Sequence, residues 1–91
     1  MPISTAQFTL TANTPRQIVA PDRMNQHVCI HNHEHNQNKE IYIGNSSVTP
    51  TTGIHAVATQ TSMITIGPGD DLWAVAVDDG SVIQVLVVKQ D

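Results

Sequence analysis

Turn-forming residues divide this sequence into segments that are too short for most helices. Proline or glycine falls at positions 15, 21, 44, 50 and 53 and in the segment Gly67-Pro68-Gly69, so apolar runs recur about every 8 to 12 residues. Val and Ile together number 19 and Thr 10, against three Leu, and branched side chains of this kind favour pleated surfaces. The sequence therefore predicts an all-β fold, a small β-sandwich or jelly-roll-like domain of about eight short antiparallel strands.

Two segments show the alternation that is typical of half-buried strands. In residues 5–12 the side chains of Phe8 and Leu10 share one face, while threonines and a glutamine take the other. In residues 26–32 the same pattern directs Val28 and Ile30 inward and the intervening His27, Cys29 and His31 outward. Further strands are expected around residues 40–44, 54–58 and 62–67.

The last strands are apolar on both faces. The segment LWAVAVDDGSVIQVLVV predicts a hairpin across residues 78–81, where Gly80 can adopt a positive φ. A strand with two apolar faces is either central in a sandwich or covered by another subunit. We therefore expect a homo-oligomer.

Length and charge limit the number of domains and the partners that we expect. A chain of 91 residues fits one domain, with residues 1–13 as an N-terminal arm or first strand and residues 14–91 as a single β-sandwich domain. The net charge is −4 and only three aromatic side chains are present, so nucleic acid is not an expected partner. The apolar runs are too short to span a membrane. The start lacks the pattern of a secretion signal and Cys29 stands alone, so we expect synthesis in a reducing cytoplasm.

The segment IHNHEHNQNKE carries histidine at every second position, at 31, 33 and 35. On a strand these side chains would point the same way, roughly 6.5 to 7 Å apart, and two imidazoles can hold one metal ion. A pair is not a closed site, so a third ligand or symmetry copies of the chain would have to complete it. The surrounding Asn, Gln and Lys residues favour a polar connection instead. We assign no metal ligand, with a shared site at a symmetry axis as the alternative.

Other candidate sites lack partners at a suitable spacing. Cys29 lies two residues from histidines on either side, which is too far along a strand for the hydrogen bond that activates a thiolate. The pairs Asp70-Asp71 and Asp78-Asp79 bracket one strand and suit calcium in ligand type, but not in EF-hand spacing. We assign no catalytic or cofactor-binding residue, and we do not interpret the chain as an enzyme.

Two resemblances to known families bear on function. His33-Glu34-His35 followed by Glu40 resembles the first half of the cupin metal motif, but His27 stands where that motif has glycine and no histidine follows Gly67-Pro68-Gly69. A longer resemblance runs from about residue 14 to residue 88. EIYIGNSSVTPTTGI and then ITIGPGDDLWAVAVDDGSVIQVLVV are similar to a group of small bacteriophage virion structural proteins, of the capsid decoration or head fibre type.

The phage resemblance implies a structural role in the virion. The expected function is a non-enzymatic decoration or cement protein that binds the outer surface of the assembled head and stabilises it. Its expected partner is the major capsid protein of the shell, and its expected assembly is a homotrimer. The alternative is a fibre or tail module that recognises a host-surface carbohydrate, and a cupin-like metalloenzyme is the third hypothesis. The first residues are either an arm that adds a strand to a neighbour or an ordinary first strand.

Overall fold

Eight strands in two sheets form the whole of the regular structure in the computed structural model, which describes residues 3–34, 39–57 and 60–90. Sheet A has the order β1-β8-β3-β6 and sheet B the order β2-β7-β4-β5, with every neighbouring pair antiparallel. The strands are β1 (Ile3–Leu10), β2 (Arg16–Val19), β3 (Asn25–Asn32), β4 (Ile41–Gly44), β5 (Ile54–Ala56), β6 (Thr61–Ile66), β7 (Leu72–Ala76) and β8 (Ser81–Gln90). The described residues contain no helix that is long and apolar enough to cross a membrane. The predicted all-β sandwich is confirmed.

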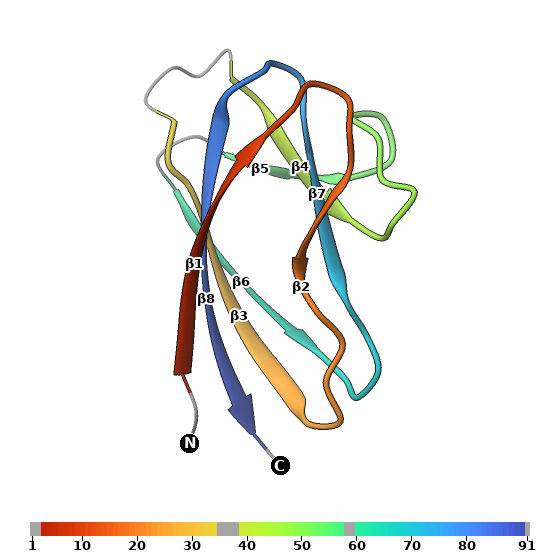
Figure 1. The fold of residues 1–91 in the computed structure, drawn as a ribbon, viewed down its shortest axis with the longest axis vertical. Helices are drawn as coiled ribbons and strands as arrows, with labels where there is room; N and C mark the ends of the chain where they lie inside the picture. The colour runs from red at the N-terminus through yellow and green to blue at the C-terminus, as the bar shows by residue number, and fades with distance from the viewer. Residues whose placement is uncertain (1–2, 35–38, 58–59, 91) are drawn as a thin grey trace.

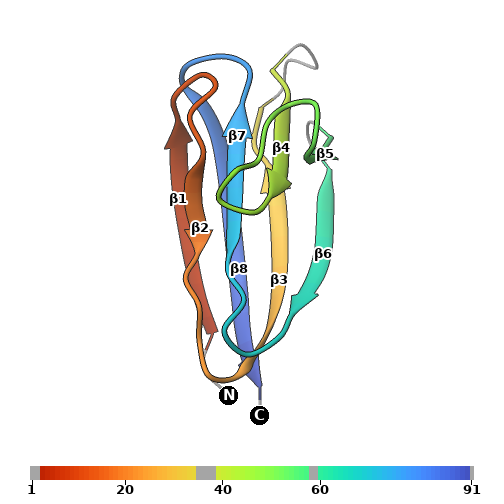
Figure 2. The same ribbon diagram turned by 90° about the vertical axis from the view of Figure 1, so that its right-hand side faces the viewer.

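The strand order is that of a jelly roll. Pairing is nested along the chain, since β1 pairs with β8, β2 with β7, β3 with β6 and β4 with β5. This long antiparallel ribbon is rolled so that β8 also pairs with β3 and β7 with β4. The two sheets that result lie face to face, as Figures 1 and 2 show. The segment 3–10 is thus an edge strand of its own sandwich.

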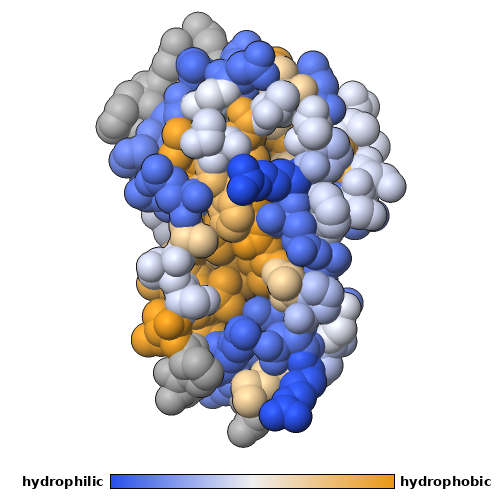
Figure 3. Space-filling view, viewed as in Figure 1, coloured by the Kyte–Doolittle hydropathy of each residue, from blue (hydrophilic) through white to orange (hydrophobic). Residues whose placement is uncertain are grey.

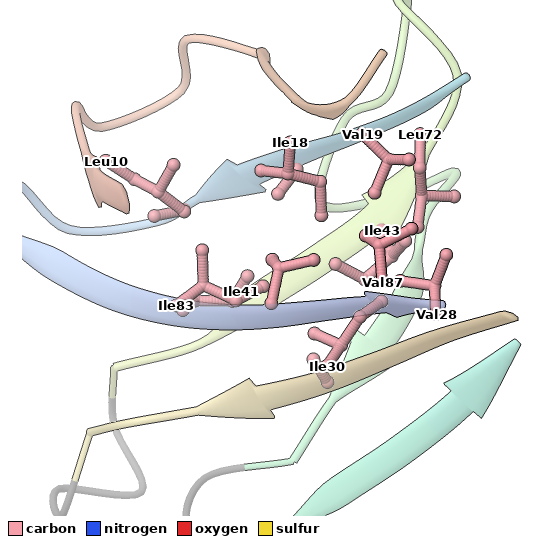
Figure 4. Packing of buried hydrophobic residues seen from close by; sticks show 14 of the residues in the cluster. Leu10, Ile18, Val19, Val28, Ile30, Ile41, Ile43, Leu72, Ile83 and Val87 are labelled. Carbon is pink, nitrogen blue, oxygen red and sulfur yellow. The ribbon is translucent and has the colours of Figure 1, made fainter. Parts of the chain in front are cut away.

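The core fills the space between the sheets. Strand β3 alternates along its length, with Val28 and Ile30 buried and the intervening side chains half-exposed, as predicted. Branched side chains from both sheets meet in the middle (Figure 4). The largest side chains of this core with almost no exposure are Leu10, Ile41, Ile83 and Val28.

Buried amides tie the two ends of β3 to the rest of the chain. The Gln26 side chain donates to the carbonyl of Ala20 at 3.0 Å, and the Asn32 side chain donates to the carbonyl of Ala56 on β5 at 2.8 Å. The second bond joins sheet A to sheet B. Buried amides are costly unless they are paired, so these two bonds favour one position of β3 between its neighbours.

The predicted hairpin of the last two strands is wrong. Gly80 has the expected positive φ of 80°, but β7 lies in sheet B and β8 in sheet A. The connection is anchored to the end of β1, because the Gly80 N–H donates to the Leu10 carbonyl at 2.9 Å and Asp79 accepts from the Ala12 N–H at 2.7 Å. Strands β7 and β8, which are apolar on both faces, are each central in their own sheet. This is one of the two placements that the sequence allowed, the other being cover by a second subunit.

We expect Ile83→Ala to lower the free energy of unfolding by about 2–5 kcal/mol, because Ile83 is fully buried at the centre of sheet A and the substitution leaves a cavity. Urea unfolding followed by circular dichroism measures the change. The matched control is Val82→Ala on the outer face of the same strand, where the side chain is only half-buried. Equal losses for both variants would contradict the described register.

Candidate functional site

The outward side of sheet A is a regular four-stranded surface that the described chain leaves open. We call it the sheet A face and define it by the outward side chains of its four strands. They are Ile3, Thr5, Gln7 and Thr9 on β1, Val82, Gln84, Leu86, Val88 and Gln90 on β8, Asn25, His27, Cys29 and His31 on β3, and Thr61, Met63 and Thr65 on β6. None of these residues is Asp, Glu, Lys or Arg, so the face has no permanent side-chain charge.

Charged side chains lie at the ends of the strands and in the connections. Lys89, near the end of β8, belongs to an inward row and forms an ion pair with Asp22 at 2.8 Å. Glu34, just after β3, accepts from the Val82 N–H at 2.9 Å. A surface without charge loses little solvation when another protein covers it. The sheet A face is therefore suited to contact over its full width.

A shallow depression of 570 Å³ lies near the middle of the sheet A face. Amides and aliphatic side chains line it, and the Gln84 side chain donates to the Gln7 side chain at 3.2 Å across the β1–β8 pair. Leu86 remains 38% exposed beside them. The lining thus combines hydrogen-bonding groups that can adjust with an apolar contact.

The histidines predicted to face outward do so. Each of two rings bonds to a threonine on the neighbouring β6, with His27 Nδ1 at 3.0 Å from Thr65 Oγ1 and His31 Nδ1 at 3.3 Å from Thr61 Oγ1. The ring of His33 lies 5.9 Å from that of His31, centre to centre. These contacts fit the side-by-side spacing expected of a strand.

The other metal-type residues are dispersed. His35 lies outside the described residues, and His55 lies on β5 in the opposite sheet. Glu40 accepts from the Tyr42 hydroxyl at 2.5 Å. Across residues 3–34, 39–57 and 60–90, no group of three His, Cys, Asp or Glu side chains is close enough to hold an ion. The histidine segment and Glu40 are therefore not gathered into one site within that part of the chain.

The remaining sequence candidates are also separate. Among the described residues, the rings of His27 and His31 hydrogen-bond to hydroxyl and amide groups, not to the thiol of the free Cys29 between them. The aspartate pairs lie at opposite ends of β7, a separation of roughly 15 Å or more at strand rise. Asp70 accepts from the Gly67 N–H within its own turn, and Asp79 accepts from the Ala12 N–H just after β1. The two aspartate pairs cannot share one calcium ion.

Part of the outward side of sheet B is covered by the chain itself. The connection 45–53 folds back over β4, and its Val48 is buried. Val75, an outward residue of the central strand β7 that pairs with Tyr42, is only 1% exposed. Two glycines permit the close approach, because a Cβ atom at Gly44 or Gly53 would lie 2.8 Å from the Val48 methyl group. Sheet B thus has a lid and sheet A does not.

Gly53→Ala should lower the free energy of unfolding by about 1–3 kcal/mol, because the added methyl group also meets the Tyr42 Cβ at 2.7 Å and the backbone has to shift. Urea unfolding measures the change. Gly67→Ala is the control, since a methyl group there meets only an aspartate oxygen at 3.3 Å. A Gly53→Ala protein as stable as this control would contradict the packing of the lid.

All three aromatic side chains already have partners within the chain. Tyr42 stacks on His55 with ring centres 5.0 Å apart. Trp73 Nε1 donates to Asp71 at 3.0 Å, and the Arg16 guanidinium lies 4.9 Å from the centre of the Phe8 ring. None of the three lines the depression on sheet A. The exposed face that remains is aliphatic and amide-rich.

The hydrogen bond to Glu40 raises the pKa of Tyr42 above its ordinary value, because ionisation would place two negative charges side by side. Glu40→Gln should lower this pKa, which absorbance titration detects cleanly since the chain has one tyrosine. Asp70→Asn, in the turn between β6 and β7, removes the same charge elsewhere and should leave the titration unchanged. An unchanged pKa in the Glu40→Gln protein would refute this assignment.

The sequence interpretation missed several of the residues that line the depression, although Cys29 and His31 are among its lining residues. It marked the outward histidines and Cys29, but Thr5, Gln7, Gln84 and Leu86 come from strands at opposite ends of the chain. The available signal was the lack of charge at alternate positions of four strands. Those positions are recognised as one surface only when the strand order is known.

Comparison with protein-family models gives no match to this chain, and neither do comparisons with curated proteins and with solved structures. The resemblance to bacteriophage virion proteins therefore stays a prediction, and function has to be argued from the site.

Proposed function

We propose that this chain is a non-enzymatic structural protein of a bacteriophage virion. It acts as a decoration or cement protein that binds the major capsid protein on the outer surface of the assembled head, after synthesis in the host cytoplasm. The sheet A face is the contact surface. By binding the assembled shell in preference to its separate subunits, the protein stabilises the shell by mass action.

The observation that carries the proposal is the lack of charge across the sheet A face. Four strands contribute outward side chains there, and none is permanently charged. A protein that stays in water as a monomer usually distributes charge over such a surface, whereas interface centres are depleted in charge. Leu86 and Met63 add exposed apolar contacts at 38% and 79%.

The jelly-roll fold is compatible with this role but does not distinguish it from the other two functional hypotheses. Jelly rolls occur in viral capsid proteins, lectin domains and cupins, so the topology is shared by all three functional hypotheses. The proposal prefers capsid contact to carbohydrate binding because sugar sites present aromatic faces. Here Tyr42 stacks on a histidine, Trp73 is half-buried, and Phe8 lies beneath Arg16.

The proposal includes a homo-oligomer, with a trimer as the preferred state. A trimer matches the local three-fold axes of an icosahedral shell, so each subunit can make the same contact with the shell. Each trimer would then bind through three copies of the sheet A face. Even if one copy binds the shell weakly, three together raise the overall affinity.

The first test is the number and place of copies on particles released by the bacterium that carries the gene. We expect quantitative mass spectrometry to find hundreds of copies for each head, and immunogold labelling to mark the head surface. A few copies confined to the tail would overturn the proposal and favour the fibre or tail module.

The second test places a charge in the middle of the face. Particles stripped of the protein should rebind the wild-type protein and become more resistant to heat. Gln84→Lys should weaken this binding at least tenfold, because Gln84 lies at the centre of sheet A and a buried unpaired lysine is costly. Ser46→Lys, in the exposed connection over sheet B, is the control of equal charge. Equal binding by both variants would exclude the sheet A face.

A further inference from the structure

We infer that copies of this chain assemble head to tail through the two edges of sheet A, with β1 of one copy pairing antiparallel with β6 of the next. The inference supplies a contact between copies for the homo-oligomer of the proposed function, and this contact forms an open row unless successive copies are rotated so that the row closes into a ring. It rests on that part of the proposal alone and does not require a capsid.

Apart from the Arg16 guanidinium, which bonds to the Thr9 carbonyl at the end of β1, the edges of sheet A lack the features that normally prevent strand addition. Strand β1 pairs with β8 in unbroken register from Ile3 to Leu10, and neither β1 nor β6 contains proline or a charged residue. The edges of sheet B are protected, since β2 has four residues with a bulge between Gln17 and Val19, and β5 has three residues. Short strands, bulges, prolines and charges are the usual defences of an edge. The same chain thus protects one sheet and leaves the other open.

The backbone groups of β1 that point away from its sheet can be identified. The Thr9 carbonyl accepts from the Arg16 side chain, outside the pairing with β8, at 3.1 Å. Because backbone groups alternate in direction along an antiparallel strand, Ile3, Thr5 and Gln7 direct theirs to the same open side. These three residues present three N–H and three C=O groups along the edge.

The same reasoning applies to β6. The His33 N–H donates to the Val82 carbonyl at 3.0 Å, so the odd-numbered residues of β3 bond to β8 and the even-numbered ones bond to β6. Their partners on β6 are even-numbered, as in the pair Val28 and Ile64. Thr61, Met63 and Thr65 therefore point their backbone groups to the open side. This edge also presents three N–H and three C=O groups.

The two edges are complementary in direction and length. Successive strands of sheet A alternate in direction, so β1 and β6 run opposite ways. Two copies in the same orientation therefore bring β1 against β6 as an antiparallel pair. Matching the open groups of both edges places Ile3 opposite Thr65, Thr5 opposite Met63, and Gln7 opposite Thr61. Ile3 and Met63, which are 65% and 79% exposed, become diagonal neighbours.

Side-chain shape selects β6, rather than a second β1, as the partner of β1. The small inward residues Ser4 and Ala6 leave a cleft of 190 Å³ between the sheets beside β2. Figure 3 views this open side and shows apolar side chains inside the cleft. Ile64 is an inward residue of β6 but remains 41% exposed. In the matched register it lies opposite Ser4 of the next copy and fills the cleft, whereas a second β1 would bring only another Ser4 and Ala6.

Native mass spectrometry of edge variants tests the inference. Thr5→Pro and Met63→Pro each remove an N–H that points away from the sheet, so neither removes a hydrogen bond within the monomer. We expect the wild-type protein to be an oligomer and each variant to be a monomer with wild-type circular dichroism. If a proline variant does not fold, Thr5→Lys and Met63→Lys put a charge on the same edges and leave the backbone intact.

Mixing the two variants distinguishes head-to-tail pairing from other assemblies. Each variant keeps one intact edge of the opposite kind, so an equimolar mixture should form a dimer of twice the 9.9 kDa chain mass. A wild-type protein that stays monomeric at high concentration would overturn the inference. An oligomer that survives Met63→Pro would also overturn it, since it would pair through β1 alone.

The control separates this inference from the capsid proposal. Gln84→Lys charges the same face on the central strand β8 and leaves both edges open. It should keep the wild-type mass while losing particle binding. A fall to monomers in the Gln84→Lys protein would mean that copies assemble through the face, which contradicts edge pairing.

Discussion

The structure depends on one constraint, which is that a chain of this length builds only two layers. Alternate residues of a strand point to opposite faces, so each sheet buries one face against the other and turns its second face outward. The inward residues of β3 and β8 supply most of the sheet A side of the core. The remaining differences between the two sheets concern how their outward faces are covered and how their edge strands are protected.

The two sheets differ in how they meet this constraint. On sheet B the outward Val75 is buried, the connection 45–53 packs its Val48 closely on Gly44 and Gly53, and the edge strands are short. Sheet A has no such lid, its face carries no permanent charge, and its edge strands are long and regular. This asymmetry is the reason for proposing sheet A as the side that other molecules cover. A shell that covers the face and copies that extend the edges would each remove a different part of the exposed surface.

Parts of the site could be recognised in the sequence and parts could not. Alternation predicted that His27, Cys29 and His31 face outward, because that depends only on neighbours along one strand. The depression joins Thr5 to Leu86, which lie close only because β1 pairs with β8. Residues that act together across the sheet are found only when the strand order is known.

Composition and the spacing of breakers determined the fold class, because β-branched runs of this length can be buried only as strands. The same local chemistry predicted a positive φ at Gly80, and the structure has it. Local chemistry did not decide where the chain goes after that turn. A hairpin and a crossing to the other sheet need similar turn residues, and the choice depends on the bonds of Gly80 and Asp79 to the distant end of β1. The sequence therefore determined which segments are strands and which side chains alternate, whereas the nested pairing decided which sheet each strand joins and which face stays open.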